Sequence, residues 1–434
     1  MPYERPVTVV GAGLAGAEAA YQLGGRGVPV RLIDMKPHKK TPAHQSDDFG
    51  ELVCSNSLRS DRTQNAAGLL KEELRRFRSL VMRAADATRV PAGGALAVDR
   101  AGFSAYITEA IKNEPRIEVI GEEVTALPDA PAVIATGPLT AGALFEDIES
   151  NIAPGLHFYD AAAPIIVKES IDMGVAFYAS RYGRGEDYIN CPMTETEYRA
   201  FYMALIAAKP AKLHGFETPR VFEGCMPVEV MAKRGEQTLA FGPLKPVGLT
   251  DPRTGGRPYA VVQLRQDDAN GVLYNMVGFQ TNLTFPEQRR VFRMIPGLSG
   301  AAFARYGVMH RNTFLPSPGI LGMDYSVKRM PGLFFAGQIT GVEGYVESAA
   351  SGFVAAIGMH RFLNGLPPLD FTRKTATGAL ARYVSEYAGG DFQPMNINYG
   401  IMEGLDGPFL NKARRYEAMA ARALAIVAEL QKIC

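Results

Sequence analysis

Two cysteines stand in segments that suit thiol chemistry. Cys54 lies in FGELVCSNSLRS, among small polar residues, and Cys225 lies at an expected turn in FEGCMPVEVMA. A thiol reacts as a nucleophile in its thiolate form, and a nearby cation such as Arg59 or Arg62 lowers its pKa. A single cysteine can equally be a small buried hydrophobic residue, so the residues alone leave both interpretations open.

The cysteine spacing also restricts the class of protein. The chain has 434 residues and two further cysteines, Cys191 and Cys434, and no two cysteines form a CxxC pair. The spacing therefore supports neither a zinc site nor a thioredoxin-type motif, and we expect no bound metal. Scattered cysteines are typical of a reducing compartment, and neither a signal peptide nor a membrane-spanning apolar run is evident. We expect a cytoplasmic protein without membrane association.

The most specific local pattern is a phosphate-binding fingerprint near the N-terminus. PVTVV predicts a buried strand, GAGLAG follows it and opens a helix, and VPVRLIDM predicts a second strand. The three glycines allow a tight turn, close approach of a pyrophosphate, and close packing of helix and strand. The helix N-terminus then faces the phosphates, and an acid ending the second strand binds a ribose. The expected dinucleotide-binding residues are Gly11, Ala12, Gly13, Leu14, Ala15, Gly16, Asp34 and Met35.

Two later segments favour FAD over NAD. APAVIATGPLT and MPGLFFAGQITGVEGYVESAASG each predict a strand that enters a glycine-containing turn, and a helix of small residues follows the second. This arrangement resembles flavoproteins of the glutathione-reductase type, in which that helix points its N-terminus at the isoalloxazine. No second GxGxxG follows a strand, so we expect no separate NADPH-binding domain. The resemblance adds Thr136, Gly137, Gly337 and Gln338 to the expected FAD site. Tyr345, in GVEGYVES, is expected there as well, stacked near the isoalloxazine or a base, unless it packs in the core.

The predicted elements divide the chain into three segments. We expect residues 1–159 and 295–434 to form one FAD-binding domain, with a C-terminal helix over 408–432. Residues 160–294 alternate strands with a helix and predict a mixed α/β insertion domain. The expected fold class is therefore α/β, a Rossmann-like FAD-binding domain of the glutathione-reductase type with a mixed α/β insertion.

Eight segments together resemble one enzyme family. They are GAGLAGAEAAYQL, FGELVCSNSLRS, GLLKEELRR, LVMRAADATRVPAGGALAVDR, DYINCPMTETEY, FEGCMPVEVMA, LTFPEQRRVFRMIPGL and FFAGQITGVEGYVESAASG. They resemble, nearly from end to end, the bacterial TrmFO (Gid) family of folate- and FAD-dependent tRNA (uracil-5-)-methyltransferases. The two cysteine segments are highly specific to that family. Asp34 departs from the glutamate of many members, but either carboxylate binds a ribose.

The resemblance implies a reaction and roles for the two thiols. Its members methylate C5 of the T-loop uridine at tRNA position 54, with 5,10-methylenetetrahydrofolate as one-carbon donor and FADH2, reduced by NADH or NADPH, as reductant. A thiolate that adds to uracil C6 lets C5 attack the methylene group. By this resemblance Cys225 is the nucleophile and Cys54 its acid/base or thiol partner, and the exchange of these roles stays open. We expect the T-arm of tRNA as partner and no obligate protein partner.

Basic residues for RNA binding must be local, because the formal net charge is only +1. LLKEELRRFRSLVMRAA predicts one amphipathic helix over residues 69–85, whose basic face either meets phosphates or is merely solvated. His310 either orients a ligand or is a hydrogen-bonded core residue. Further phosphate contacts, each otherwise an ordinary surface charge, are Arg59, Arg62, Arg289, Arg290, Arg311, Lys412, Arg414 and Arg415.

Three other functions compete with the methyltransferase. A tRNA-binding flavoprotein that acts as a scaffold or redox sensor has no need of the pair Cys54 and Cys225. A flavin disulfide reductase requires a closely spaced redox cysteine pair, which the chain lacks. An NADH oxidase activity is a side reaction open to any bound flavin. The two cysteine segments therefore favour the methyltransferase.

Overall fold

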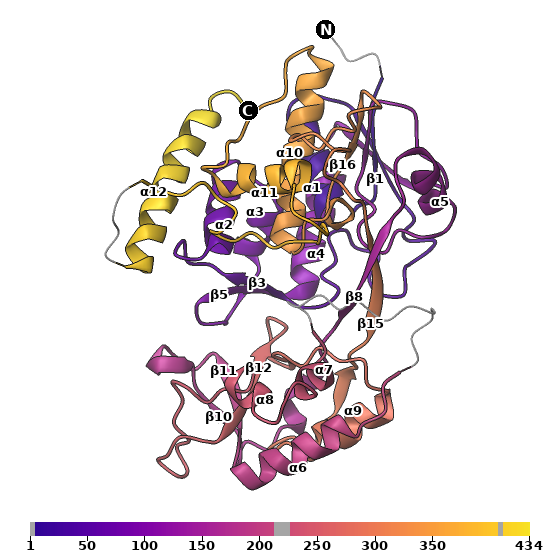
Figure 1. The fold of residues 1–434 in the computed structure, drawn as a ribbon. Helices are drawn as coiled ribbons and strands as arrows, with labels where there is room; N and C mark the ends of the chain where they lie inside the picture. The colour runs from indigo at the N-terminus through magenta and orange to yellow at the C-terminus, as the bar shows by residue number, and fades with distance from the viewer. Residues whose placement is uncertain (1–4, 212–225, 407–410) are drawn as a thin grey trace.

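The computed structural model describes residues 5–211, 226–406 and 411–434, so Cys225 lies outside the described residues. The chain forms two parts, and the paired strands β8 (Leu156–Ala161) and β15 (Met309–Phe314) run between them (Figure 1). Within the described ranges, no helix combines the length and apolarity needed to cross a bilayer.

The first part is built on a parallel sheet. Its strand order is β16-β7-β1-β2-β6, and every neighbouring pair is parallel. Parallel strands are connected through helices, and ligands bind where strand order reverses, outside the carboxyl ends of the strands. The reversal lies beside β1, the strand predicted before the glycine motif. The strands are β1 (Val7–Val10), β2 (Val30–Asp34), β6 (Ile117–Gly121), β7 (Ala132–Ile134) and β16 (Leu333–Phe335).

Helices α1 and α10 are in contact and lie beside the strands β1 and β16 in Figure 1. A methyl group on Gly352 of α10 would lie 2.2 Å from the carbonyl oxygen of Ala15, so the two backbones touch at this glycine. This contact fixes α10 relative to the turn after β1. The helices of this part are α1 (Leu14–Gly24), α2 (Ala66–Arg76), α3 (Leu80–Ala87), α4 (Arg100–Lys112), α5 (Gly142–Asn151), α10 (Tyr345–Leu363), α11 (Ala376–Glu386) and α12 (Lys412–Leu430).

The second part is an antiparallel sheet covered by short helices. Its strand order is β10-β11-β12-β13-β9-β14, with β10 (Phe177–Tyr178), β11 (Tyr188–Met193), β12 (Ala260–Gln266), β13 (Leu273–Met276), β9 (Ile165–Val167) and β14 (Phe303–Arg305). The helices are α6 (Glu195–Ile206), α7 (Val228–Ala232), α8 (Thr238–Phe241) and α9 (Phe285–Phe292).

Each part has its own hydrophobic core. One core draws on residues from both ends of the chain, and the other begins at Ala163 and ends at Ala301. Strand β14 follows residue 294 but pairs with β9 of the second part. The domain limits expected after residues 159 and 294 stay predictions.

The single helix predicted over residues 69–85 is wrong, because the chain forms α2 and α3 instead. Arg78 has φ 58°, in the left-handed region that ends a helix. The hydroxyl of Ser79 then caps α3, accepting from Met82 N at 3.2 Å and donating to a Glu18 carboxylate oxygen at 2.7 Å. The basic face expected for the single helix is therefore not formed. Lys71 is fully buried, and Arg75 forms ion pairs with acidic residues.

Lys71 makes stability depend on pH. Its ammonium donates to Ser60 O at 2.7 Å and Ala67 O at 3.0 Å, and burial, helped by the Arg59 charge, lowers its pKa to about 7. Between pH 7 and about 10.4 the unfolded chain therefore holds a proton that the folded chain has lost. Unfolding free energy rises with pH wherever the unfolded state binds more protons.

We expect the unfolding free energy of wild type, relative to Lys71→Met, to rise by up to about 4 kcal/mol between pH 7 and pH 10. Urea unfolding of both proteins at several pH values measures this difference. Lys39→Met, at a lysine whose side chain is 59% exposed, controls for the loss of a positive charge. A difference between wild type and Lys71→Met that stays flat with pH would contradict the prediction.

Candidate functional site

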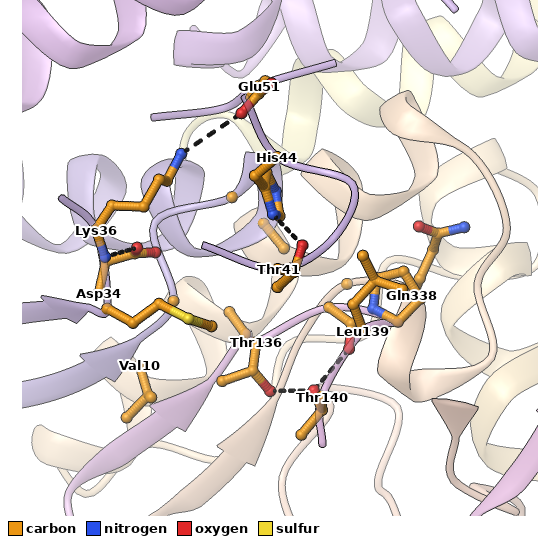
Figure 2. A pocket seen from close by; sticks show the side chains of 18 of the residues that line it. Val10, Asp34, Lys36, Thr41, His44, Glu51, Thr136, Leu139, Thr140 and Gln338 are labelled. Atoms are coloured by element: carbon orange, nitrogen blue, oxygen red, sulfur yellow. Dashed lines mark hydrogen bonds and ion pairs between the residues drawn. The ribbon is translucent and has the colours of Figure 1, made fainter. Parts of the chain in front are cut away.

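A first cavity opens at the carboxyl ends of β1 and β2, where the glycine motif turns into α1 (Figure 2). Gly11 has φ 97°, and a methyl group there would lie 2.6 Å from Ala135 O. A methyl group on Gly13, in contrast, would have nothing within 4 Å. Gly13 therefore leaves its backbone open toward the cavity, as close approach of a phosphate requires.

Asp34 ties the end of β2 to the glycine turn. One carboxylate oxygen accepts from Ala12 N at 2.6 Å and the other from Lys36 N at 2.9 Å. Each oxygen keeps a further lone pair for a ligand hydroxyl. Asp34, Met35, Leu14 and Ala15 all line the cavity, whereas the buried Ala12 and Gly16 shape the turn behind it.

The loop after β2 supplies cavity residues that the sequence motif did not reveal. Lys36 lies 4.0 Å from a Glu51 carboxylate oxygen, and the Thr41 hydroxyl lies 2.6 Å from His44 Nδ1 (Figure 2). Burial and the Lys36 ammonium lower the pKa of His44. The sequence did hold one signal for these residues, namely that they follow Asp34 closely. A chain that leaves a nucleotide-binding strand has to pass the ligand.

Two later segments close the cavity. The Thr136 and Thr140 hydroxyls lie 2.6 Å apart, and Gly137, at φ 73°, has open space where a side chain would stand. Gly337, at φ 84°, donates from N to Ser351 Oγ at 2.7 Å and brings Gln338 to the cavity. These segments follow β7 and β16, which pair side by side in the sheet.

A second cavity adjoins the first between the two parts of the molecule. The shared lining residues are Val53, Pro138, Leu139, Gln338 and Tyr345. Polar side chains face it from both parts, and these are Cys54, Ser55, Ser57, Arg59, Asp160, Arg265, Gln280, His310, Asn312, Glu343 and Asn396.

Cys54 lines the second cavity and is hydrogen-bonded to Tyr345, the first residue of α10, which lines both cavities. The Tyr345 hydroxyl oxygen accepts from Cys54 N at 2.9 Å and Ser55 N at 3.1 Å, and it lies 2.8 Å from Cys54 Sγ. Since two N–H groups occupy its lone pairs, the hydroxyl donates its own hydrogen to the sulfur. Tyr345 therefore holds the thiol in place and stabilises negative charge on it.

The expectation that Arg59 and Arg62 lower the pKa of Cys54 is wrong. Burial, followed by the Asp160 carboxylate, raises the pKa of this thiol to about 12, against the opposing effects of Tyr345 and Arg100. Arg59 instead forms an ion pair with the fully buried Glu347. In this state the Cys54 thiol keeps its proton at neutral pH.

The segment that carries Cys54 is bound to both parts of the molecule. Asn56 is fully buried and donates to Val98 O and Gln266 O, both at 2.9 Å. Arg265 of β12 donates to Ser55 Oγ at 2.8 Å and Asn56 Oδ1 at 3.1 Å. These contacts fix the position of Cys54 between the sheet of the second part and helix α10.

His310 faces the second cavity and has an unused ring nitrogen. Among the described residues its buried Nε2 has no hydrogen-bond partner, and burial lowers its pKa. A neutral imidazole with a free nitrogen is suited to a ligand group rather than to the core. The geometry thus favours the first of the two interpretations open for this residue.

The candidate phosphate-binding residues differ in whether another side chain of the protein already contacts them. Arg290 pairs with Glu287 at 2.6 Å, and Arg289 donates to the Tyr306 hydroxyl at 2.7 Å. Lys412 lies over the Tyr416 ring. The exposed residues of this set are Arg62, Arg289, Arg290, Arg311, Lys412, Arg414 and Arg415, whereas Arg59 is half-buried. Cys191 is buried in the second core.

The donors around the cavities fit a dinucleotide with an attached ring system. Gly13 is the N-cap residue of helix α1 and Gly344 that of α10, and neither N-terminus has a side-chain cap. Uncapped helix N-termini present free N–H groups that bind anions. The first suits a pyrophosphate, and the second suits the electron-rich side of a flavin ring beside Cys54. In the described residues no cluster of three or more potential metal ligands occurs.

Comparison with known proteins agrees with this geometry. A family model described as "Glucose inhibited division protein A" matches residues 6–367. A protein of Acetivibrio thermocellus named methylenetetrahydrofolate–tRNA-(uracil-5-)-methyltransferase TrmFO is 57% identical over 426 residues, which are 98% of each chain. A protein of the same name from Enterococcus faecalis is 56% identical over 428 residues, again 98% of each chain.

Among solved structures, Aquifex aeolicus GidA in its form II crystal superposes with a TM-score of 0.70 and 16% identity. The match covers 99% of this chain and 74% of that one, and the form I crystal gives a TM-score of 0.66. At this identity the likeness concerns the fold alone. The predicted α/β fold class with a Rossmann-like FAD-binding domain is confirmed.

Proposed function

This chain belongs to the TrmFO family of methylenetetrahydrofolate–tRNA-(uracil-5-)-methyltransferases, and on that premise we propose that it methylates C5 of a uridine in tRNA. The one-carbon unit comes from 5,10-methylenetetrahydrofolate. The target is the T-loop uridine at position 54, and the product is 5-methyluridine. NADH or NADPH reduces the bound FAD, which supplies the reducing equivalents, and the enzyme works in the cytoplasm.

FAD is the cofactor that the first cavity suits best. Asp34 and the N-terminus of α1 would hold its ribose and pyrophosphate. The turn at Gly337 and Gln338 and the N-terminus of α10 would hold the ring end, next to Tyr345. When bound and reduced, FAD supplies hydride for the methylene carbon. The side chains that line the cavity are not hydride donors. The role of the protein is therefore to position the base, the folate and the thiols.

The observation that carries the proposal is the position of Cys54. Cys54 lines the second cavity, and its sulfur lies 2.8 Å from the hydroxyl of Tyr345, which lines both cavities. A scaffold has no use for a thiol held there. We assign Cys225 as the nucleophile that adds to C6 and Cys54 as its acid/base or thiol partner, with exchange of the roles as the alternative.

The second cavity gives the base and folate a place to meet. The target base must leave its stack to reach a thiol inside this cavity. His310, with its free Nε2, and Arg265 offer hydrogen-bond donors or acceptors to the pterin or the pyrimidine. The exposed arginines and lysines named above are candidates for the phosphates of the T-arm.

The test is methyl transfer to a T-arm RNA hairpin by the FAD-loaded protein. Methylenetetrahydrofolate with NADH or NADPH is the donor system, S-adenosylmethionine is the control donor, and a hairpin with cytidine in place of the target uridine is the control substrate. We expect 5-methyluridine only with folate and only in the uridine hairpin. If protein that binds RNA and FAD makes no product, the methyltransferase is excluded and the scaffold function remains.

A further inference from the structure

A buried carboxylate faces the cavity that holds Cys54. Glu343 precedes α10, is only 5% exposed and lines the second cavity. Its backbone is clamped on both sides, because its N–H donates to Met395 O at 3.0 Å and its C=O accepts from the Asn396 side chain. The side chain therefore has a fixed origin beside the helix N-terminus.

Among the described residues, the carboxylate of Glu343 has one hydrogen-bonding partner, the side-chain amide of Gln338. Gln338 Nε2 lies 2.9 Å from one oxygen and 2.8 Å from the other. A carboxylate has about four lone-pair directions, and a single amide group occupies at most two of them. The remaining capacity is on the side of the cavity, where a ligand atom can be reached.

Burying a carboxylate with only a neutral amide partner is costly, so a structural role explains it poorly. Burial, followed by the Asp160 carboxylate, raises the pKa of Glu343 to about 8. The group thus gains and loses its proton near the working pH, which is where a general acid or base is most effective. The titratable or charged groups that face it are Cys54, Arg59, Asp160 and Glu347.

We propose that Glu343 is the base that removes the C5 proton of the target uracil. This inference rests on the proposed methyl transfer. The C5–H bond breaks, its proton goes to a Glu343 carboxylate oxygen, and its electron pair forms the double bond to the exocyclic methylene carbon. The amine of the one-carbon donor leaves with the electrons of its bond to that carbon and takes up one proton.

The Cys54 thiol, which keeps its proton, is suited to give that second proton. Glu343 and Cys54 then divide the acid and base work between them. Bound and reduced FAD would supply the hydride that the methylene carbon needs, and formation of the C5=C6 double bond then releases the thiolate from C6 with its electron pair. After the cycle the proton on Glu343 returns to solvent and Cys54 is protonated again.

The test follows tritium release from a T-arm hairpin that carries [5-³H]uridine, together with gel-stable RNA–protein adduct. We expect Glu343→Gln to release tritium about 100-fold more slowly than wild type. The variant should still bind FAD and the hairpin, and it should accumulate the adduct, because addition at C6 precedes the blocked step. Tritium release by wild type should rise with pH up to about 8 and then level, and the residual rate of the variant should lack this rise.

Matched variants make the outcome specific. Glu343→Asp keeps the acid and should retain part of the activity. Glu18→Gln alters another buried carboxyl whose pKa is raised, but it lines neither cavity and should release tritium as wild type does. Cys54→Ala should lose product and release tritium more slowly, because the donor amine takes up the Cys54 proton in the step that breaks the C5–H bond.

Several results would overturn the proposal. One is tritium release by Glu343→Gln at the wild-type rate. Another is loss of release in Cys54→Ala or in Asp160→Asn while Glu343→Gln keeps it, because the base would then be one of those groups. Loss of FAD or RNA binding in Glu343→Gln without any adduct would mean a structural role. If the wild type forms no 5-methyluridine, the proposed function itself is wrong. A difference between the variants, in contrast, bears only on the role of Glu343.

Discussion

Methyl transfer to a T-arm hairpin is expected to fall by at least about 10³-fold when Cys54 is replaced by alanine. Removing a group that transfers a proton in the transition state typically costs about 10²–10⁴-fold, and this thiol also anchors the Tyr345 hydroxyl. The fold should be kept, because the backbone N–H groups of Cys54 and Ser55 still donate to Tyr345. Product formation and FAD content of the purified variant are the measurements.

Covalent trapping decides between the two assignments of the thiols. If Cys225 is the nucleophile, Cys54→Ala accumulates a denaturant-stable adduct with RNA, and Cys225→Ala forms none. If the roles are exchanged, adduct forms only in Cys225→Ala. Cys191→Ala, at a cysteine in the core of the second part, is the control and should keep wild-type activity if the fold is kept. Full activity in Cys54→Ala would exclude thiol chemistry at this position.

The parts of this site that the sequence predicts are those encoded within a short segment. The turn at Gly11, the open approach at Gly13 and the acid Asp34 follow from one strand, one helix and the next strand, whose geometry is local. The strand before Gly337 was also predictable, because a short apolar run that ends in a glycine turn is typical of a buried strand. The match of eight segments to one family supplied the cysteine roles.

The contacts missed from sequence are those between distant segments. Cys54 and Tyr345 lie 291 residues apart, and no local pattern places a hydroxyl on that sulfur. Burial then overrides the nearby arginines, so a pKa expected to fall rises instead. Glu343 stands two residues before Tyr345 in the motif GVEGYVES, but its role depends on Gln338 and Asp160 facing it. The break between α2 and α3 did have a local signal, the capping residue Ser79.

Replacing two glycines of the fingerprint by alanine is expected to affect different properties, the unfolding free energy at Gly16 and the FAD affinity at Gly13. At Gly16 the new carbon would lie 1.8 Å from Gly11 O and 3.2 Å from the Ala135 side chain. The first atom belongs to the backbone of the turn after β1, and the second to the segment after β7, so neither can rotate away. Overpacking of a core commonly costs about 1–3 kcal/mol, and a clash with backbone costs more. We expect Gly16→Ala to lose at least about 3 kcal/mol of unfolding free energy.

Gly13→Ala is the matched substitution, because the same methyl group there meets nothing within 4 Å and the residue has φ −70°, which alanine adopts without strain. Its unfolding free energy should stay within about 1 kcal/mol of wild type. The methyl group would nevertheless stand where the backbone has to approach a pyrophosphate, so FAD affinity should fall at least about tenfold. Urea unfolding of the apoproteins and FAD titration separate the two effects. Equal stability of Gly16→Ala and Gly13→Ala would contradict the tight turn, and unchanged FAD affinity in Gly13→Ala would mean that the cofactor phosphates lie elsewhere.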